Sequence, residues 1–228
     1  MSQDNLVKLN LGCGLQCPEG WINIDSSMGA RLARKPLLKK ILHGVIPAKW
    51  GILPNTNWPD NVKWMNITRR FDYADNSVDV IYSSHTIEHL TYNEGAFVFK
   101  ESFRVLKPGG IIRIIVPDFA VTVQTYLNYR EKSPHLAAKK FLDDTYYFEI
   151  PIPDSLPGLI KYYFKRKNNH HFLYDKEGLE YQLMVAGFVD IRSMKWGESR
   201  IPGIEKIDIP ERFQGAICLE GIKPATGQ

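Results

Sequence analysis

A predicted helix, a stop signal and a buried strand follow one another in residues 94–116, which read EGAFVFKESFRVLKPGGIIRIIV. We expect the helix to span residues 94–106, with Asn93 as its N-terminal cap. The two glycines after the proline end this helix. The apolar run 111–116 is typical of a buried strand. A helix that leads into a buried strand predicts one unit of a parallel α/β sheet.

The segments on both sides of this unit extend the sheet. No helix separates the last two predicted strands, so an antiparallel final pair fits best. The predicted fold class is α/β: a Rossmann-like open sheet, mostly parallel with an antiparallel C-terminal strand. Asp175 is expected to cap one further helix, which Gly187 ends. The predicted strands are residues 5–11, 21–25, 62–67, 78–83, 111–116, 188–195 and 213–222.

Size and composition predict one cytoplasmic domain. The chain has 228 residues, which fits a single domain over residues 1–228 with insertions at 26–60 and 119–170. Its three cysteines are too few for a disulfide framework. No apolar signal region or membrane-spanning run is visible. A net charge of +4 is too small to predict nucleic-acid binding by itself. We therefore expect a cytoplasmic location and no nucleic-acid partner.

The glycine loop at residues 9–14, which read LNLGCG, indicates a nucleoside site. Gly12 and Gly14 let a ligand approach the backbone, and Asp25 stands where an acid can accept two ribose hydroxyls. Asp25 follows Gly14 by only eleven residues, so the first crossover helix is expected to be shortened or missing. Cys17 occupies the third-glycine position of the dinucleotide motif. A pyrophosphate needs a helix N-terminus, which S-adenosylmethionine (SAM) does not, so the loop favours SAM.

Three segments resemble those of the class I SAM-dependent methyltransferases of the small-molecule type. They are the glycine loop, residues 71–90 and residues 104–118, in the order and at the spacing found in that family. Residues 179–189 are similar to the family's last helix where it enters a strand. The resemblance implies an enzyme that moves a methyl group from SAM to an acceptor. We expect this acceptor to be a small molecule or of glycan type, methylated at oxygen or nitrogen.

The resemblance also implies roles for single residues. The loop would approach the amino-acid end of SAM, and an acid after the second strand would hold the ribose. The pair after the third strand would lie against adenine, and serines after the fourth would border the methionine portion. The loop residues are Gly12, Cys13 and Gly14, and the acid is Asp25. The pair against adenine is Asn66 and Ile67, and the serines are Ser83 and Ser84.

His85 is the predicted catalytic residue. It follows the fourth strand, and an imidazole can accept a proton near neutral pH if the acceptor needs a general base. The electrophilic methyl of SAM is already activated, so the protein mainly has to align the two reactants. Asp118 and His171 are further candidates for the base.

Two other functions stay open. His85, Glu88 and His89 match the His-x-x-Glu-His pattern of inverted zinc peptidases. A peptidase would need a third ligand from another helix, and none is evident, so we expect no metal site. The altered loop after Gly14 would also suit a non-catalytic Rossmann-like binding protein.

The acceptor is expected to bind under the two insertions, which mix bases with aromatic residues. Such a surface suits an anionic or lipid-linked glycan acceptor. Residues 37–46 have apolar residues at helical spacing. This helix would be a lid packed on the domain or would rest on a membrane interface. The bases and aromatics are Arg31, Arg34, Lys39, Trp50 and Trp58 in the first insertion, and Tyr146, Tyr147, Tyr162 and Tyr163 in the second.

Overall fold

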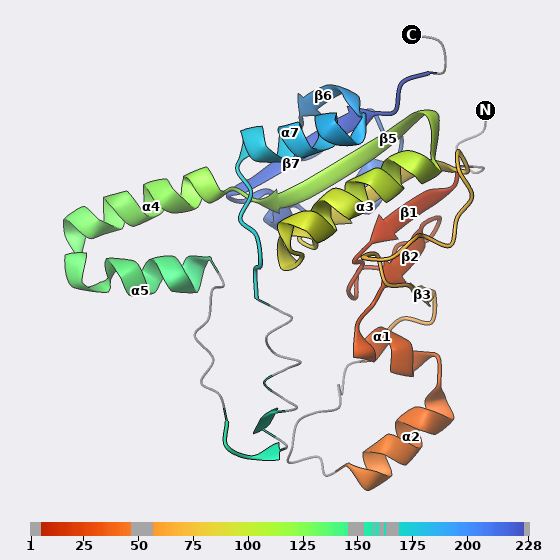
Figure 1. Ribbon diagram of the computed structural model, residues 1–228, viewed down its shortest axis with the longest axis horizontal. Coiled ribbons are helices and arrows are strands. Elements are labelled where there is room, and N and C mark those ends of the chain that lie inside the picture. The colour runs from red at the N-terminus through yellow and green to blue at the C-terminus, as the bar shows by residue number, and fades with distance from the viewer. Residues whose placement is uncertain are drawn as a thin grey trace.

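The computed structural model describes residues 6–46, 57–145, 153–156, 158–159, 162 and 169–225 (Figure 1). They contain a seven-stranded sheet in the order β3-β2-β1-β4-β5-β7-β6. The pairings among β1 to β5 are parallel, and β7 runs antiparallel to both β5 and β6. The predicted fold class is therefore confirmed. The strands are β1 Lys8–Leu11, β2 Ile22–Asp25, β3 Val62–Trp64, β4 Val78–Ser84, β5 Leu106–Pro117, β6 Val189–Ser193 and β7 Ala216–Ile222.

The helices lie around this sheet and beyond its ends. In Figure 1, α3 and α7 run side by side along one face, and α4 and α5 form a helical pair that projects from the sheet. No helix in the described part of the chain is both long and apolar enough to span a membrane. The helices are α1 Met28–Ala33, α2 Pro36–Val45, η3 Ile87–His89, α3 Tyr92–Val105, α4 Phe119–Lys132, α5 Pro134–Asp144, α7 Lys176–Ala186, η4 Ile204–Lys206 and η5 Pro210–Phe213.

The N-terminus of α3 differs from the prediction. Thr91, not Asn93, is the N-cap. The Glu94 backbone N–H donates to the Thr91 hydroxyl (3.4 Å), and the Thr91 N–H donates to the Glu94 carboxylate (2.9 Å). This reciprocal capping box satisfies two backbone donors that an Asn93 cap would leave without partners. The other predicted cap is confirmed, because the Asp175 side chain accepts from Gly178 at the start of α7.

Different elements cover the two faces of the sheet. On β5, Ile112 and Ile114 pack into the core under α3 and α7. Ile115 packs on the opposite face with Ile204 and Ile207, in and after the short helix η4. Arg113 also points to this opposite face, fully buried, with one guanidinium nitrogen 2.5 Å from Asp208 and another 2.7 Å from Glu220. This face of the sheet therefore contains a buried group of three charged side chains. The alternation of apolar residues along β5 does not predict it.

The connection from β1 to β2 contains no helix, as predicted. All of residues 12–21 are described, and none is helical. The buried side chains of Asn10 and Asn23 hold the connection instead. The Asn10 amide donates to Gln16 O (2.9 Å) and to the Asn23 side chain (3.0 Å), and the Asn23 amide donates to Pro18 O (3.1 Å). These bonds satisfy backbone carbonyls that a crossover helix would have satisfied internally.

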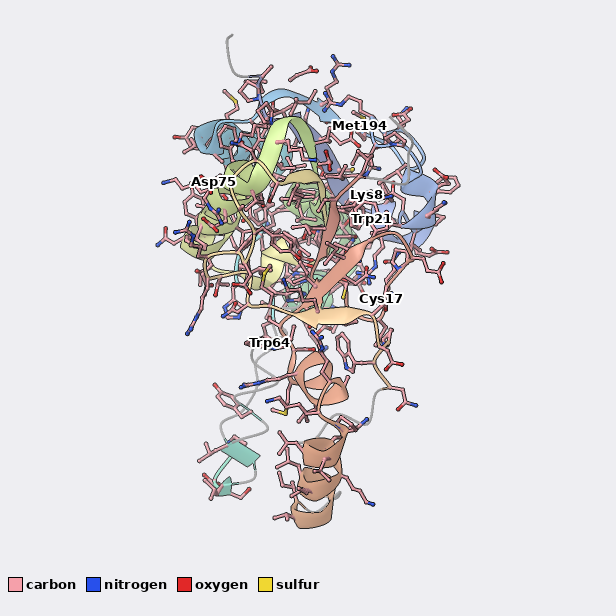
Figure 2. All side chains as sticks on the ribbon, turned by 90° about the vertical axis from the view of Figure 1, so that its right-hand side faces the viewer. Lys8, Cys17, Trp21, Trp64, Asp75 and Met194 are labelled. Carbon is pink, nitrogen blue, oxygen red and sulfur yellow. The ribbon has the colours of Figure 1, made fainter. Side chains whose placement is uncertain are left out.

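Helices α1 and α2 extend from the β3 edge of the sheet. Trp64, at the end of β3, marks this junction in Figure 2. Its indole N–H donates to Ser26 O (3.2 Å), and the Arg31 guanidinium lies 5.2 Å from its ring centroid. The predicted helix in residues 37–46 is confirmed as α2. Trp50, Tyr146, Tyr147 and Tyr163, which we predicted near the acceptor, lie outside the described residues.

Candidate functional site

The carboxyl ends of β1, β2 and β4 bring the predicted cofactor residues together. The Gly14 N–H donates to Asp25 Oδ2 (3.0 Å), and the Ser27 N–H donates to Asp25 Oδ1 (2.7 Å). The Cys13 N–H donates to Ile24 O (2.9 Å). The short loop therefore folds directly onto the end of β2, and Asp25 reaches it without a crossover helix. Each carboxylate oxygen retains a second lone pair that can accept from a ligand hydroxyl.

Gly12 and Gly14 both have a positive φ, but their surroundings differ. Gly12 has a φ of 69°, and a Cβ there would lie 2.2 Å from atoms of Thr86. Gly14 has a φ of 55°, and apart from its own chain neighbours no described residue has an atom within 4 Å of the position of its Cβ. Gly12 is therefore needed for packing between β1 and the segment after β4, whereas Gly14 faces open space in which a ligand can approach the backbone.

We expect Gly12→Ala to lower the free energy of unfolding more than Gly14→Ala does. Both substitutions place alanine in the left-handed region, at about 1–2 kcal/mol each. The Thr86 clash adds overpacking of about 1–3 kcal/mol at Gly12. Urea unfolding of the two variants measures the difference. Equal losses would contradict the proposed packing role of Gly12.

Cys13 is buried, and its thiol lies beside that of Cys17. The two sulfur atoms are 3.7 Å apart, and Cys13 Sγ also lies 3.4 Å from Gly14 O. Burial raises the pKa of both thiols, so they are neutral at physiological pH. The Cys13 side chain packs with Ala30 and Val62. Of Cys13, only the backbone is therefore available to contact a cofactor bound at this loop.

The other predicted cofactor residues are more buried or are bonded within the protein. Asn66 Oδ1 accepts from the Thr68 backbone N–H and hydroxyl, both at 3.0 Å, and this turn stops β3 at Trp64 rather than at the predicted Ile67. Ile67 is 5% exposed and belongs to the main core. Ser83 is fully buried and donates to Leu11 O (3.3 Å). Ser84 ends β4 with a buried hydroxyl.

His85 follows β4 in the left-handed backbone region, with a φ of 50°. Its Nε2 lies 2.8 Å from the Arg212 backbone oxygen, so this nitrogen carries the proton of the neutral ring. Its Nδ1 lies 3.6 Å from Glu88 Oε1. Burial lowers the pKa of His85. A base at this position would therefore act through Nδ1. The alternative candidates are placed differently, since Asp118 caps α4 and His171 is exposed.

A histidine cluster adjoins this position. Ligand atoms of Glu88, His89 and His170 all lie within 4.8 Å of one another. Burial raises the pKa of Glu88 to about 8 and lowers that of His170 to about 4. The zinc-peptidase alternative needs His85 and His89 on one face of a helix, and this helix does not form, because η3 is a short 3-10 helix and His85 lies before it. His170 replaces His85 in the triad. In the sequence, His170 stands out only as one of two adjacent histidines, at residues 170 and 171.

Comparisons with known proteins identify part of the chain. Residues 55–114 match a protein-family model described as a methyltransferase domain. This segment contains β3, β4, η3 and α3 with the first part of β5, and it includes Asn66, Ile67, Ser84 and His85. No curated protein sequence matches the chain. The prediction of a methyltransferase domain is therefore supported over this segment.

Several solved structures have a similar arrangement of elements at low identity. A SAM-dependent methyltransferase from Archaeoglobus fulgidus is 16% identical, with a TM-score of 0.47, over 96% of this chain and 87% of its own. One from Thermotoga maritima is 16% identical, with a TM-score of 0.47, over 95% and 81%. Phosphoethanolamine N-methyltransferase 2 of Haemonchus contortus, bound to SAM, is 14% identical, with a TM-score of 0.45, over 96% and 49%. This chain thus spans about half the length of the Haemonchus enzyme.

Proposed function

We propose that this protein transfers the methyl group of SAM to an oxygen or nitrogen atom of a small-molecule or glycan-type acceptor. The observation that carries the proposal is the bond between the Gly14 N–H and the Asp25 carboxylate, which joins the carboxyl ends of β1 and β2. In open α/β sheets, ligands bind at this edge. The methyltransferase segment contributes β4 to the same edge.

The residues at this edge fit SAM. Asp25 would hold the ribose hydroxyls through the lone pairs that Gly14 and Ser27 leave unused. The backbone of Gly12, Cys13 and Gly14 would border the amino-acid end, with Gly14 in closest approach because its Cα faces open space. Asn66 would lie against adenine with its amide, and Ile67 would support that contact from the core. Ser84 would border the methionine portion, at the end of β4.

The reaction needs alignment more than activation. When bound, SAM supplies a sulfonium methyl that an acceptor lone pair attacks in line, so the protein gains rate mainly by orientation. An acceptor hydroxyl or ammonium must also lose a proton, and His85 is the candidate base. The hydrogen bond from its Nε2 to the Arg212 carbonyl fixes the tautomer that has its lone pair on Nδ1.

We expect His85→Asn to slow methyl transfer by about 100-fold or more, which is the usual contribution of a general base. Asparagine tolerates the left-handed backbone better than most residues, so the fold should be retained. The Kd for SAM should stay within about threefold of wild type, since His85 is not assigned to the cofactor. His135→Asn, at an exposed position on α5, is the control. A rate equal to that of the control would remove His85 from the chemistry.

An anionic or lipid-linked acceptor is favoured by the exposed surface of α2. Leu37, Ile41 and Val45 lie four residues apart along one side of the helix and are 72%, 53% and 75% exposed. Lys35 and Lys40 lie beside them, also exposed. Apolar side chains flanked by bases suit the boundary between lipid tails and anionic headgroups. In Figure 1, α2 stands out from the sheet on the side of β3.

Tritiated-methyl transfer from SAM into fractionated cell extract tests the proposal. We expect the label in the fraction of small anionic or lipid-extractable molecules. Label recovered in protein or nucleic acid would contradict the proposed acceptor class but leave the reaction intact. Absence of SAM binding at millimolar concentration in a calorimetric titration would overturn the function, and would favour the non-catalytic Rossmann-like binding protein.

A further inference from the structure

The cluster of Glu88, His89 and His170 joins two distant parts of the chain. Glu88 and His89 lie on η3, directly after β4, and His170 lies in the segment that leads into α7. Backbone bonds hold the two segments together, since the N–H groups of His171 and Phe172 donate to Glu88 O at 2.8 and 3.2 Å. The backbone therefore fixes the cluster, and the side chains do not have to assemble it by themselves.

Glu88 is the member that most needs a partner. Its side chain is 1% exposed, and no other described residue donates a hydrogen bond to either carboxylate oxygen. The His85 imidazole does not supply one, because its Nδ1 lies 3.6 Å from Oε1, beyond hydrogen-bond distance. A buried carboxyl group without partners is costly, and such groups in proteins are paired or coordinate metals.

The two imidazoles are oriented as metal ligands commonly are. His89 Nδ1 lies 3.1 Å from the backbone oxygen of Asn169, to which it donates, so Nε2 carries the lone pair. The His170 imidazole has a backbone hydrogen bond with Thr145. Histidines that bind metals usually bond through their other nitrogen to a carbonyl or carboxylate, which sets the tautomer and the ring direction. The His89 and His170 rings meet edge to face, with centroids 4.9 Å apart.

We propose that Glu88, His89 and His170 bind one divalent transition-metal ion, with zinc as the best-suited metal. Two imidazole nitrogens and one carboxylate oxygen suit zinc, whereas calcium and magnesium prefer oxygen ligands alone. Bonds of about 2.0–2.2 Å to one ion hold ligand atoms roughly 3–4 Å apart, and the three ligand atoms here all lie within 4.8 Å of one another. Three protein ligands leave a fourth position for water or another ligand. This proposal does not depend on methyl transfer.

The test is metal binding by the whole chain, prepared without a polyhistidine tag and stripped with a chelator. We expect about one zinc or cobalt ion per chain after loading and dialysis, and visible cobalt absorption typical of four-coordinate sites. His170→Gln and Glu88→Gln should each weaken binding by about 100-fold or more, since even supporting residues of metal sites contribute 10–100-fold. His171→Gln, at the exposed neighbouring position, should bind like wild type. Circular dichroism checks that every variant is folded.

Three results would overturn the proposal. The first is a wild-type chain that retains no zinc, cobalt, nickel or manganese after loading. The second is undiminished binding by both His170→Gln and Glu88→Gln, which would place the metal elsewhere. The third is a loss at His171→Gln equal to that at His170→Gln. The two ligand variants come from different segments, so failure of one to fold leaves the other to decide.

Discussion

Asp25→Ala is expected to weaken SAM binding by about 100-fold or more. Hydrogen bonds to a charged group contribute about 1.5–3 kcal/mol each, and two ribose hydroxyls would bond to this carboxylate. The substitution also removes the acceptor for the N–H groups of Gly14 and Ser27, so the loop loses the contact that holds it on β2. Isothermal titration calorimetry with SAM measures the change in Kd.

Two further variants make this result specific. Asp25→Asn keeps one acceptor oxygen, so its Kd should lie between those of wild type and Asp25→Ala. Asp72→Ala removes an exposed carboxylate away from the loop and should leave the Kd unchanged. If Asp25→Ala bound SAM as tightly as Asp72→Ala, the assignment of the cofactor to this edge would fail.

Arg113→Met is expected to lower the free energy of unfolding by about 3–5 kcal/mol. The guanidinium is fully buried between the Asp208 and Glu220 carboxylates, and removing one member of such a group leaves buried charges uncompensated. For a chain of this size, each kcal/mol corresponds to roughly 2–4 °C, so the Tm should fall by roughly 6–20 °C. Thermal unfolding followed by circular dichroism measures it.

An exposed ion pair provides the matched control. Arg192 pairs with Asp190 at 2.8 Å, and both side chains are largely exposed. Arg192→Met should cost less than about 1 kcal/mol, because surface pairs are weak. Adding Asp208→Asn to Arg113→Met should recover part of the loss by removing one uncompensated carboxylate. Equal losses for Arg113→Met and Arg192→Met would contradict the importance of the buried group.

Local patterns were sufficient to predict most elements, and errors arose where two local solutions compete. Asn93 and Thr91 are both good caps, and only the reach of Glu94 back to the Thr91 N–H decides between them. The predicted third strand is too long because Asn66 forms a turn with Thr68. In each case a side chain bonds to the nearby backbone, and the choice between such bonds depends on geometry that periodicity does not encode.

The candidate site was predictable where it depends on strand ends. Gly12, Gly14 and Asp25 were identified because parallel strands place their carboxyl ends at one edge. How Asp25 reaches the loop was not predictable, since it depends on the side-chain bonds of Asn10 and Asn23 across the short connection. In the sequence, these two residues look like ordinary polar residues within strands. Only their burial shows that their hydrogen bonds take the place of those in a crossover helix.

The amino-acid sequence by itself determined which segments form strands, the mostly parallel sheet with its antiparallel final pair, the missing first helix, the glycine loop and the methyltransferase segment. These depend on residue types within a few positions of one another, where side-chain periodicity and turn chemistry operate. Only the tertiary structure decided that Arg113 lies between Asp208 and Glu220, and that His170 joins Glu88 and His89. Those partners lie far apart in the chain, and burial in one fold brings their charges and lone pairs within reach.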